Sequence, residues 1–204
     1  MTKKYELVLD DTISFWGWKL FRIRALISFG SVEAGDLGGY IQKEENLSHD
    51  DKAWVSGNAK VSGNAKVSGN AKVWGDAKVS GNAKVWGDAK VWGDAWVSGN
   101  AEVWGNAEVW GNAEVSGNAE VWGNAEVWGN AKVSELGDII VFKNHWSSGR
   151  HFTYTKSNKM WKVGCFYGTG QELIEKAYRD SEKSGNYYKA YVDFVESLEK
   201  IGNQ

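Results

Sequence analysis

One histidine of this chain has the neighbours that general acid–base chemistry requires. His49 stands beside Asp50 and Asp51, at the entry to a repetitive segment. A carboxylate in contact with an imidazole can orient the ring, so that His49 could serve as a general base. The simpler interpretation, which we favour, is that His49 is a polar residue of a turn.

A second group of reactive side chains follows the repetitive segment. His145, His151 and the only cysteine, Cys165, could supply a nucleophile and its base. Cys165, however, alternates with Val163 in an apolar segment, which predicts a buried thiol of the core. A zinc site needs about four ligands with suitable spacing, and these residues do not offer it. We therefore predict no catalytic residue, no metal site and no cofactor.

The segment Gly168, Thr169, Gly170 lies between an expected strand and an expected helix. Free amides at a helix N-terminus can bind a phosphate or a carboxylate, which makes these three residues a candidate anion site. The segment lacks the lysine of a phosphate-binding loop. A turn followed by a helix cap is the simpler interpretation.

These side chains flank a repeat that dominates the chain. The unit A-x-V-[S/W]-G-[N/D] occurs fourteen times from Ala53 to Val133. Alanine and valine stand two positions apart, so they point to the same side of an extended segment. Glycine with asparagine or aspartate then favours a corner with positive φ. A period of six predicts a coil built as a prism, with one hexad on each side.

The residue after each valine repeats every eighteen residues, which predicts three hexads per coil. One phase holds only serines, and the other two phases hold tryptophans. The tryptophans are Trp74, Trp92, Trp110 and Trp128 in one phase and Trp86, Trp104 and Trp122 in the other. Strands one coil apart lie ~4.8 Å from each other, so the rings should stack. They could stiffen the coils or offer a platform for sugars or bases, and we favour stiffening.

The repeat resembles the hexapeptide-repeat family, and the resemblance covers about eighty of the 204 residues. It implies a left-handed parallel β-helix with a triangular section. Together with the segment Gly35–Ile41, the repeat also resembles uncharacterised proteins of phages and prophages. Many members of the family are acyltransferases that use a histidine near the coils. The coils here contain no histidine and no inserted loops, so we predict that the protein is not an enzyme.

Three segments are expected in this mainly β chain. Residues 1–52 form an N-terminal β cap and entry coil, residues 53–137 the hexapeptide-repeat β-helix, and residues 138–204 a C-terminal α+β (βββαα) domain. In the cap, we expect short strands at Tyr5–Leu9 and Leu20–Leu26 and tight turns at Gly35–Gly39.

The C-terminal segment lacks the hexad pattern and is expected to contain both strands and helices. Its three expected strands are Asp138–Phe142, Phe152–Lys156 and Met160–Phe166. A capping box, Thr169-x-x-Glu172, predicts a first helix that ends near Glu182. A second helix is predicted by one apolar stripe. The stripe consists of Tyr188, Tyr191, Val195, Leu198 and Ile201.

The outward residue between alanine and valine changes along the repeat. It is lysine at positions 60 to 90 and then glutamate, at Glu102, Glu108, Glu114, Glu120 and Glu126, with Trp54, Trp96 and Lys132 as exceptions. Two copies in antiparallel orientation would bring lysine opposite glutamate, which makes a homodimer a candidate. A two-fold axis through Trp96 would pair Lys78 with Glu114, but it would also oppose Lys60 and Lys132.

Composition limits the partners. The formal charge of −2 gives no bias toward nucleic acid, and the glutamate half interrupts any basic groove. No apolar run approaches the ~20 residues of a membrane span, and one cysteine fits a reducing compartment. We predict a non-enzymatic interaction module in the cytosol of a bacterial host. It would bind another macromolecule, by the phage resemblance a host defence or regulatory protein, through its charged and tryptophan-lined sides and its C-terminal domain. The alternatives are a degenerate acyltransferase relative and a carbohydrate-binding protein.

Overall fold

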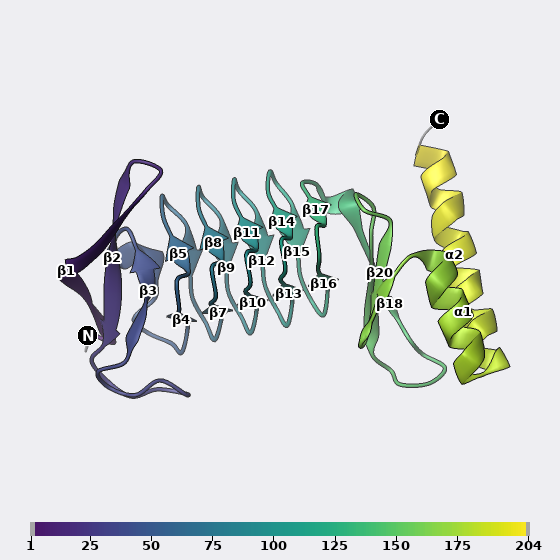
Figure 1. Ribbon diagram of the computed structural model, residues 1–204, viewed down its shortest axis with the longest axis horizontal. Coiled ribbons are helices and arrows are strands. Elements are labelled where there is room, and N and C mark those ends of the chain that lie inside the picture. The colour runs from purple at the N-terminus through teal and green to yellow at the C-terminus, as the bar shows by residue number, and fades with distance from the viewer. Residues whose placement is uncertain (1–2, 203–204) are drawn as a thin grey trace. The chain divides into compact units, whose positions relative to one another are not determined.

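The computed structural model describes residues 3–202 (Figure 1). The chain forms two compact units, Met1–Asp138 and Ile139–Gln204. The expected cap and coils belong to the first unit, and the expected α+β segment forms the second. Within the described range, no helix is both long enough and apolar enough to span a membrane.

The repeat forms a parallel β-solenoid of about five turns, in which each hexad supplies one short strand. Three parallel sheets result, which we call the β4 side, the β5 side and the β6 side. The β4 side holds β4 (Trp54–Val55), β7 (Lys72–Val73), β10 (Lys90–Val91), β13 (Glu108–Val109) and β16 (Glu126–Val127). The β5 side holds β5 (Lys60–Val61), β8 (Lys78–Val79), β11 (Trp96–Val97), β14 (Glu114–Val115) and β17 (Lys132–Val133). The β6 side holds β6 (Lys66–Val67), β9 (Lys84–Val85), β12 (Glu102–Val103) and β15 (Glu120–Val121).

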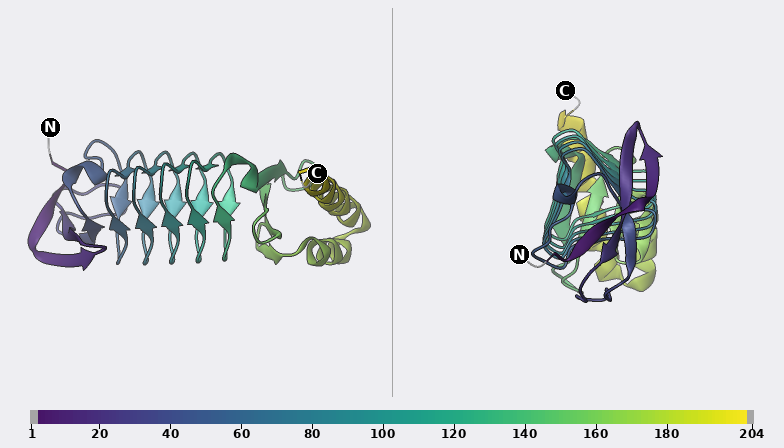
Figure 2. Two further views of the ribbon diagram at one scale, coloured as in Figure 1. Left: turned by 90° about the horizontal axis from the view of Figure 1, so that it is seen from above. Right: turned by 90° about the vertical axis from the view of Figure 1, so that its left-hand side faces the viewer.

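The register of the strands confirms three hexads per coil. Val91 pairs with Val73 on one side and with Val109 on the other, a step of eighteen residues in each direction. Seen from above, the equivalent strands of successive coils lie in line (Figure 2). The left-handed sense of the coils stays a prediction of the family resemblance.

Alanine and valine fill the interior of the coils, as predicted. Every hexad alanine from Ala53 to Ala131 and every hexad valine from Val55 to Val133 is at most 1 % exposed. The backbone hydrogen bonds run from coil to coil; the Lys84 N–H, for example, donates to the Ala101 carbonyl at 2.9 Å. Each coil therefore satisfies the polar backbone of its neighbour, and stability accumulates coil by coil.

The corners of the coils require glycine for two reasons. Gly87 has a φ of +71°, a conformation that an L side chain disfavours. A Cβ on Gly87 would also lie 2.9 Å from the Gly105 nitrogen of the next coil. The corner backbone of one coil thus packs directly on that of the next, which explains why glycine recurs in every hexad.

The N-terminal segment forms an antiparallel hairpin and a strand that joins the coils. The hairpin consists of β1 (Tyr5–Phe15) and β2 (Trp18–Ala25), and β3 (Leu37–Ile41) pairs with both β2 and β5. The expected strand at Tyr5–Leu9 is therefore longer than predicted. The turns predicted at Gly35–Gly39 are wrong for Gly38 and Gly39, which lie in β3. A Cβ on Gly38 would overlap Ile23, so these glycines permit close packing.

The entry coil is two residues longer than the others. Ile41 pairs with Val61 and Leu47 with Val67, each 20 residues on, whereas Val55 pairs with Val73 after 18 residues. The two extra residues consequently lie between Leu47 and Val55. The short 3₁₀ helix η1 (Glu44–Asn46) precedes this insertion.

The second unit is a four-stranded antiparallel sheet followed by two helices. The elements are β18 (Ile139–Lys143), β19 (His151–Thr155), β20 (Met160–Val163), β21 (Phe166–Gly168), α1 (Gly170–Asp180) and α2 (Glu182–Gly202). The single strand predicted at Met160–Phe166 is wrong, because a turn at Gly164, with a φ of +56°, divides it into β20 and β21. Cys165 lies in that turn and is exposed, so the prediction of a buried thiol is also wrong.

The apolar stripe predicted on the second helix merges two different faces. Tyr188 and Val195 do face the core, together with Val192, and these three residues are at most 8 % exposed. Leu198 and Ile201 instead lie on the exposed surface of α2, at 38 % and 67 % exposure. The helix therefore has one buried apolar face and a second apolar face in contact with water.

Candidate functional site

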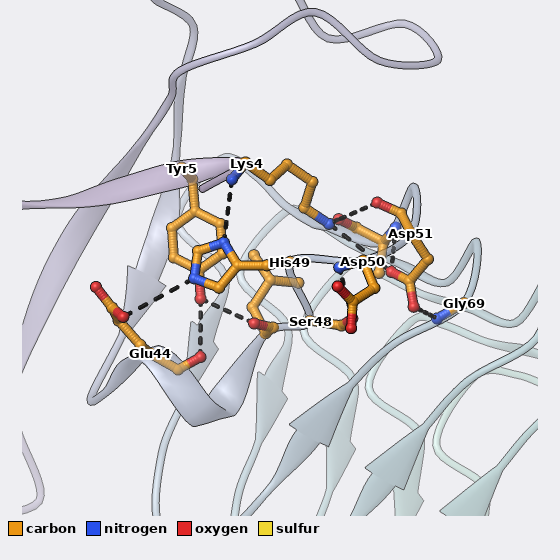
Figure 3. Close-up of polar contacts among 10 residues, drawn as sticks. Lys4, Tyr5, Glu44, Ser48, His49, Asp50, Asp51 and Gly69 are labelled. Carbon is orange, nitrogen blue, oxygen red and sulfur yellow. Dashed lines mark hydrogen bonds and ion pairs between the residues drawn. The ribbon is translucent and has the colours of Figure 1, made fainter. Parts of the chain in front are cut away.

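His49 is held in a structural contact (Figure 3). Its ring stacks on Tyr5 at 4.2 Å, and its Nδ1 accepts the Lys4 backbone N–H at 3.2 Å. A neutral imidazole with Nδ1 as acceptor carries its proton on Nε2, which lies 3.9 Å from a Glu44 carboxylate oxygen. Burial lowers the pKa of His49, an effect that Glu44 partly offsets. With its acceptor nitrogen engaged, the ring has no free base for catalysis.

Lys4 is a buried cation that no motif or repeat singles out in the sequence. Its side chain is 1 % exposed, and its Nζ donates to the carbonyls of Asp51 and Ala53, each at 2.8 Å (Figure 3). Burial lowers the pKa of Lys4, and Asp51 opposes that shift. The Asp51 carboxylate in turn accepts the Gly69 N–H at 2.5 Å. Lys4 and Asp51 thus fix the two-residue insertion of the entry coil to β1 and to the next coil.

The reactive side chains of the second unit are not assembled for nucleophilic catalysis. His145 contacts the Tyr191 hydroxyl at 3.4 Å, His151 begins β19, and Cys165 lies in the β20–β21 turn. Within residues 3–202, no hydrogen bond joins Cys165 to a histidine. The same residues contain no cluster of three or more metal-binding side chains.

The candidate anion site at Gly168, Thr169 and Gly170 is filled by a side chain of its own helix. The capping box is present as predicted: the Thr169 N–H donates to the Glu172 carboxylate at 2.7 Å, and the Glu172 N–H donates to Thr169 Oγ1 at 3.3 Å. The backbone hydrogen bond from Thr169 lowers the pKa of Glu172. A Cβ on Gly170 would lie 2.7 Å from Val192, so this glycine permits the packing of α1 on α2.

The two tryptophan ladders form at the predicted corners. Trp74 and Trp92 stack at 4.8 Å with 4° between their planes, and Trp86 and Trp104 stack at 5.0 Å with 2°. The remaining steps measure 4.6 Å (Trp92–Trp110), 5.5 Å (Trp110–Trp128) and 6.0 Å (Trp104–Trp122). Because the faces of the inner rings lie against one another, these rings present mainly their edges to solvent, and a free ring face remains only at the ends of each ladder. This geometry favours stiffening over a continuous platform for sugars or bases.

The outward charges pair within the chain where lysine gives way to glutamate. Lys84 lies 2.9 Å from Glu102 on the β6 side, and Lys90 lies 2.8 Å from Glu108 on the β4 side. On the β5 side, Lys132 lies 3.4 Å from Glu114. Glu102, Glu108 and Glu114 therefore each have a cation of their own chain beside them. Exposed pairs of this kind contribute little to stability, roughly 0–1 kcal/mol each.

The β1–β2 hairpin covers part of the β5 side, where the candidate two-fold axis through Trp96 would lie. Trp96 donates from Nε1 to Ser80 at 3.1 Å, and its ring contacts Trp16 of the β1–β2 turn at 5.1 Å. The Lys60 ammonium lies 5.7 Å above the Phe15 ring. A second copy could reach Trp96 only together with Trp16, so this side is not open at its centre.

Asparagine ladders are a feature that the sequence analysis missed. Asn82 donates to Asn100, and Asn100 donates to Asn118, each at 3.0 Å across one coil. The corner formed by Asn106 and Asn124 repeats the contact at 3.3 Å. The eighteen-residue spacing that revealed the tryptophan ladders would have revealed these ladders too.

A groove of about 850 Å³ runs along the β4 side. Its wall at the N-terminal end is the loop Phe29–Val32, and its floor carries Lys72, Lys90 and Glu108. Trp74 and Trp92 line one edge of this groove. The sequence analysis did not identify the groove, because the loop before β3 carries no repeat and no motif.

The second apolar face of α2 is the most exposed apolar surface of the C-terminal unit. We call it the α2 stripe. It consists of Tyr187, Tyr191, Phe194, Leu198 and Ile201. Phe194, Leu198 and Ile201 are 50 %, 38 % and 67 % exposed. Tyr187 and Tyr191 are half-buried and contact Trp146 at 4.6 and 5.7 Å, which joins the stripe to the aromatic core.

No protein-family model matches the chain, and no curated protein matches it either. The coils establish a parallel β-solenoid, and the resemblance to the hexapeptide-repeat family rests on the repeat alone.

Proposed function

We propose that this protein is a non-enzymatic interaction module that binds a protein partner through the α2 stripe. The observation that carries the proposal is the exposure of Phe194, Leu198 and Ile201 along one helix face. Contiguous apolar surface of this kind marks interaction sites on proteins that otherwise bury their apolar side chains.

The spacing of the α2 stripe indicates the form of the partner. Its residues follow one another at intervals of four, three, four and three, from Tyr187 to Ile201. This is the interval of a helix that pairs with a second helix along an a/d seam. Ala190 and Ser197, which flank the seam, are small enough to permit close approach. An amphipathic helix of the partner is the element that such a seam accepts.

The resemblance to phage and prophage proteins makes a bacterial host protein the first partner to test. A defence or regulatory protein in the host cytosol would fit that resemblance. On the coils, we propose Glu120, which has no cation partner among residues 3–202, as a secondary contact for a basic group of the partner.

A self-complementary contact is a second proposal for the coils. On the β6 side, the outward residues are Lys66, Lys84, Glu102 and Glu120 in order. An antiparallel two-fold axis between Lys84 and Glu102 would place Lys66 opposite Glu120 of a second copy, and the reverse. Light scattering at low salt tests this homodimer, and a monomeric mass there would contradict it.

A degenerate acyltransferase is the alternative activity. It predicts that an acyl-coenzyme A raises the melting temperature of the protein. Because the coils contain no histidine and His49 is engaged by Lys4, we expect no shift.

Capture from nuclease-treated bacterial lysate tests the α2 stripe directly. We expect the tagged protein to retain one host protein in stoichiometric amount and Phe194→Asp to lose it. Lys189→Asp introduces the same residue on the far side of α2, where Lys189 is 52 % exposed, and should retain the partner. Circular dichroism must show that both variants melt like the wild type. Retention that is equal in all three proteins, or absent in all three, contradicts the proposal.

A further inference from the structure

We propose that the groove on the β4 side binds an acidic oligosaccharide, with one sugar ring on Trp74 and a carboxylate between Lys52 and Lys72. The site belongs to the first unit and is independent of the α2 stripe. It combines an open aromatic face, unpaired cations and carboxylate acceptors in one groove beside the loop Phe29–Val32.

The aromatic face comes from the beginning of a ladder. Each inner tryptophan of the Trp74 ladder has a ring on both sides, but Trp74 has only Trp92 as a ring neighbour among the described residues. One coil earlier, the same corner holds Ser56, because Val55 pairs with Val73. Serine covers no indole face. The face of Trp74 that points toward Ser56 is therefore open to the groove, and Ser56 itself lines it.

The lysines of the groove differ in whether they have an ion-pair partner. Lys90 is paired with Glu108 at 2.8 Å. The ammonium groups of Lys52 and Lys72 have no hydrogen-bond or ion-pair partner in the described part of the chain, and both side chains are exposed. Two unpaired cations beside an aromatic face favour a ligand that carries negative charge as well as a flat apolar face.

The acceptors of the groove distinguish sugars from nucleic acid. Asp88 and Glu108 line the same groove as the lysines. Their carboxylates accept hydrogen bonds from hydroxyl groups, which a saccharide has on every ring. The backbone of a DNA strand has no hydroxyl group within the chain, and its phosphates would meet two like charges. The mixture of lysine and carboxylate therefore fits a carboxylated sugar chain better than a single nucleic-acid strand.

The backbone of the groove distinguishes sugars from an extended peptide. A peptide that adds to a sheet gains its affinity from main-chain hydrogen bonds at a free edge. On the β4 side, the Trp54 N–H donates to Ala71 and the Lys72 N–H to Ala89, each at 3.0 Å along the coil axis. These groups are satisfied within the coils, so a peptide laid along the floor would find none of them free.

The wall of the groove is well defined. Phe29 and Val32 exchange two backbone hydrogen bonds of 2.9 Å, which close the loop between them. The Phe29 ring packs on Trp54 at 5.4 Å. The loop therefore stands against the coils at the end of the groove and limits how far a sugar chain can extend toward the N-terminal end of the coils.

Isothermal titration calorimetry on the full chain tests the site, with tetragalacturonate as the probe. Its methyl ester has the same rings without the charge and serves as the matched ligand control. We expect tetragalacturonate to bind with a Kd below about 1 mM and the ester to bind at least about tenfold more weakly. A glutamate tetrapeptide and a thymidine tetranucleotide test the two other ligand classes, and neither should bind.

Two pairs of variants locate the binding. Lys72→Gln should weaken binding about tenfold, since a hydrogen bond to a charged group is lost. Lys66→Gln, at the equivalent exposed position of the β6 side, should leave the Kd within about twofold. Trp74→Ser should weaken binding about fivefold through loss of the stacking face, whereas Trp122→Ser at the end of the other ladder should not. Absence of binding, equal binding by Lys72→Gln and Lys66→Gln, or preference for the peptide or the nucleotide would each overturn the proposal.

Discussion

The cores of the coils and of the C-terminal unit consist of side chains of different size. In the coils, alanine and valine recur at the same place in every hexad, and each is at most 1 % exposed. In the C-terminal unit, large rings pack at angles between a sheet and two helices; Phe152 meets Tyr188 at 69° and Trp161 at 31°. A core of small repeated side chains closes completely on itself. A core of large rings leaves part of its aromatic surface uncovered, along α2.

The two units also differ in the side chains that they expose to solvent. The outward positions of the coils carry lysine, glutamate and asparagine, and many of these side chains pair one coil apart. In the α2 stripe, Phe194, Leu198 and Ile201 are apolar and form no such polar pairs, and Phe194 is half exposed. Binding energy in protein interfaces comes mainly from apolar and aromatic side chains that become buried. We therefore propose the C-terminal unit as the site of the main contact and expect the coils to contribute rigidity.

Core truncations should show the contrast most strongly. Trp161 is 2 % exposed and contacts Phe142 and Tyr154. Trp161→Ala should therefore destabilise the C-terminal unit by about 3–5 kcal/mol. Val97→Ala removes two methyl groups from the coils and should cost about 2 kcal/mol. Calorimetric unfolding of both variants measures this. A larger loss for Val97→Ala would contradict the view that each coil contributes a small increment.

Corner glycines should show the next largest effect. Gly87→Ala imposes both a disfavoured φ and a contact of 2.9 Å with Gly105, so we expect a loss of about 2–3 kcal/mol. Gly123 has a similar φ of +67°, but a Cβ added there would meet no atom of the described residues within 4 Å. Gly123→Ala should therefore cost only about 1 kcal/mol. Equal losses in thermal unfolding would show that coil-to-coil packing does not require glycine.

The ladders should respond according to the number of ring neighbours. Trp92 stacks on two rings and Trp122 on one. At about 0.5–1.5 kcal/mol per stacked pair, Trp92→Ser should cost roughly twice as much as Trp122→Ser. Serine already occupies the same hexad position at Ser56, so the fold tolerates it. Urea denaturation measures both variants, and no loss from Trp92→Ser would mean that the ladders do not stiffen the coils.

The pH dependence of the first unit should be the smallest effect. Burial lowers the pKa of His49 from 6.5 in the folded protein, so the unfolded chain takes up a proton first as the pH falls. The stability that neutral His49 contributes is present above about pH 6.5 and is lost as the pH falls through the lowered pKa. Melting temperatures between pH 7.5 and 5.5 should fall less in His49→Gln than in the wild type. His151→Gln is the control, and an unchanged pH slope in His49→Gln would refute this origin.

The sequence was sufficient to predict the coils because their information is local and repeated. The pairing of Val91 with Val73 and Val109, the ladders and the buried alanines all follow from a step of eighteen residues. The contact of Trp16 in the hairpin with Trp96 joins residues 80 positions apart, and no repeat in the sequence predicts it. The groove wall at Phe29–Val32 escaped prediction for the same reason.

In the C-terminal unit, periodicity was present but ambiguous. Val195 and Leu198 stand three positions apart, so the sequence assigned them to one face, yet the first is buried and the second exposed. Adjacent apolar stripes cannot be separated without knowing which side meets the sheet. Cys165 was misplaced because alternation with Val163 also fits the turn that Gly164 introduces.

Photo-crosslinking in bacterial cells would compare the two surfaces most directly. Benzoylphenylalanine would replace Leu198 in the α2 stripe or, in separate proteins, Lys66 or Trp122 on the coils. We expect one specific protein adduct from position 198 and none from the two coil positions. A specific adduct from Lys66 or Trp122, with none from position 198, would contradict the assignment of the partner site to α2.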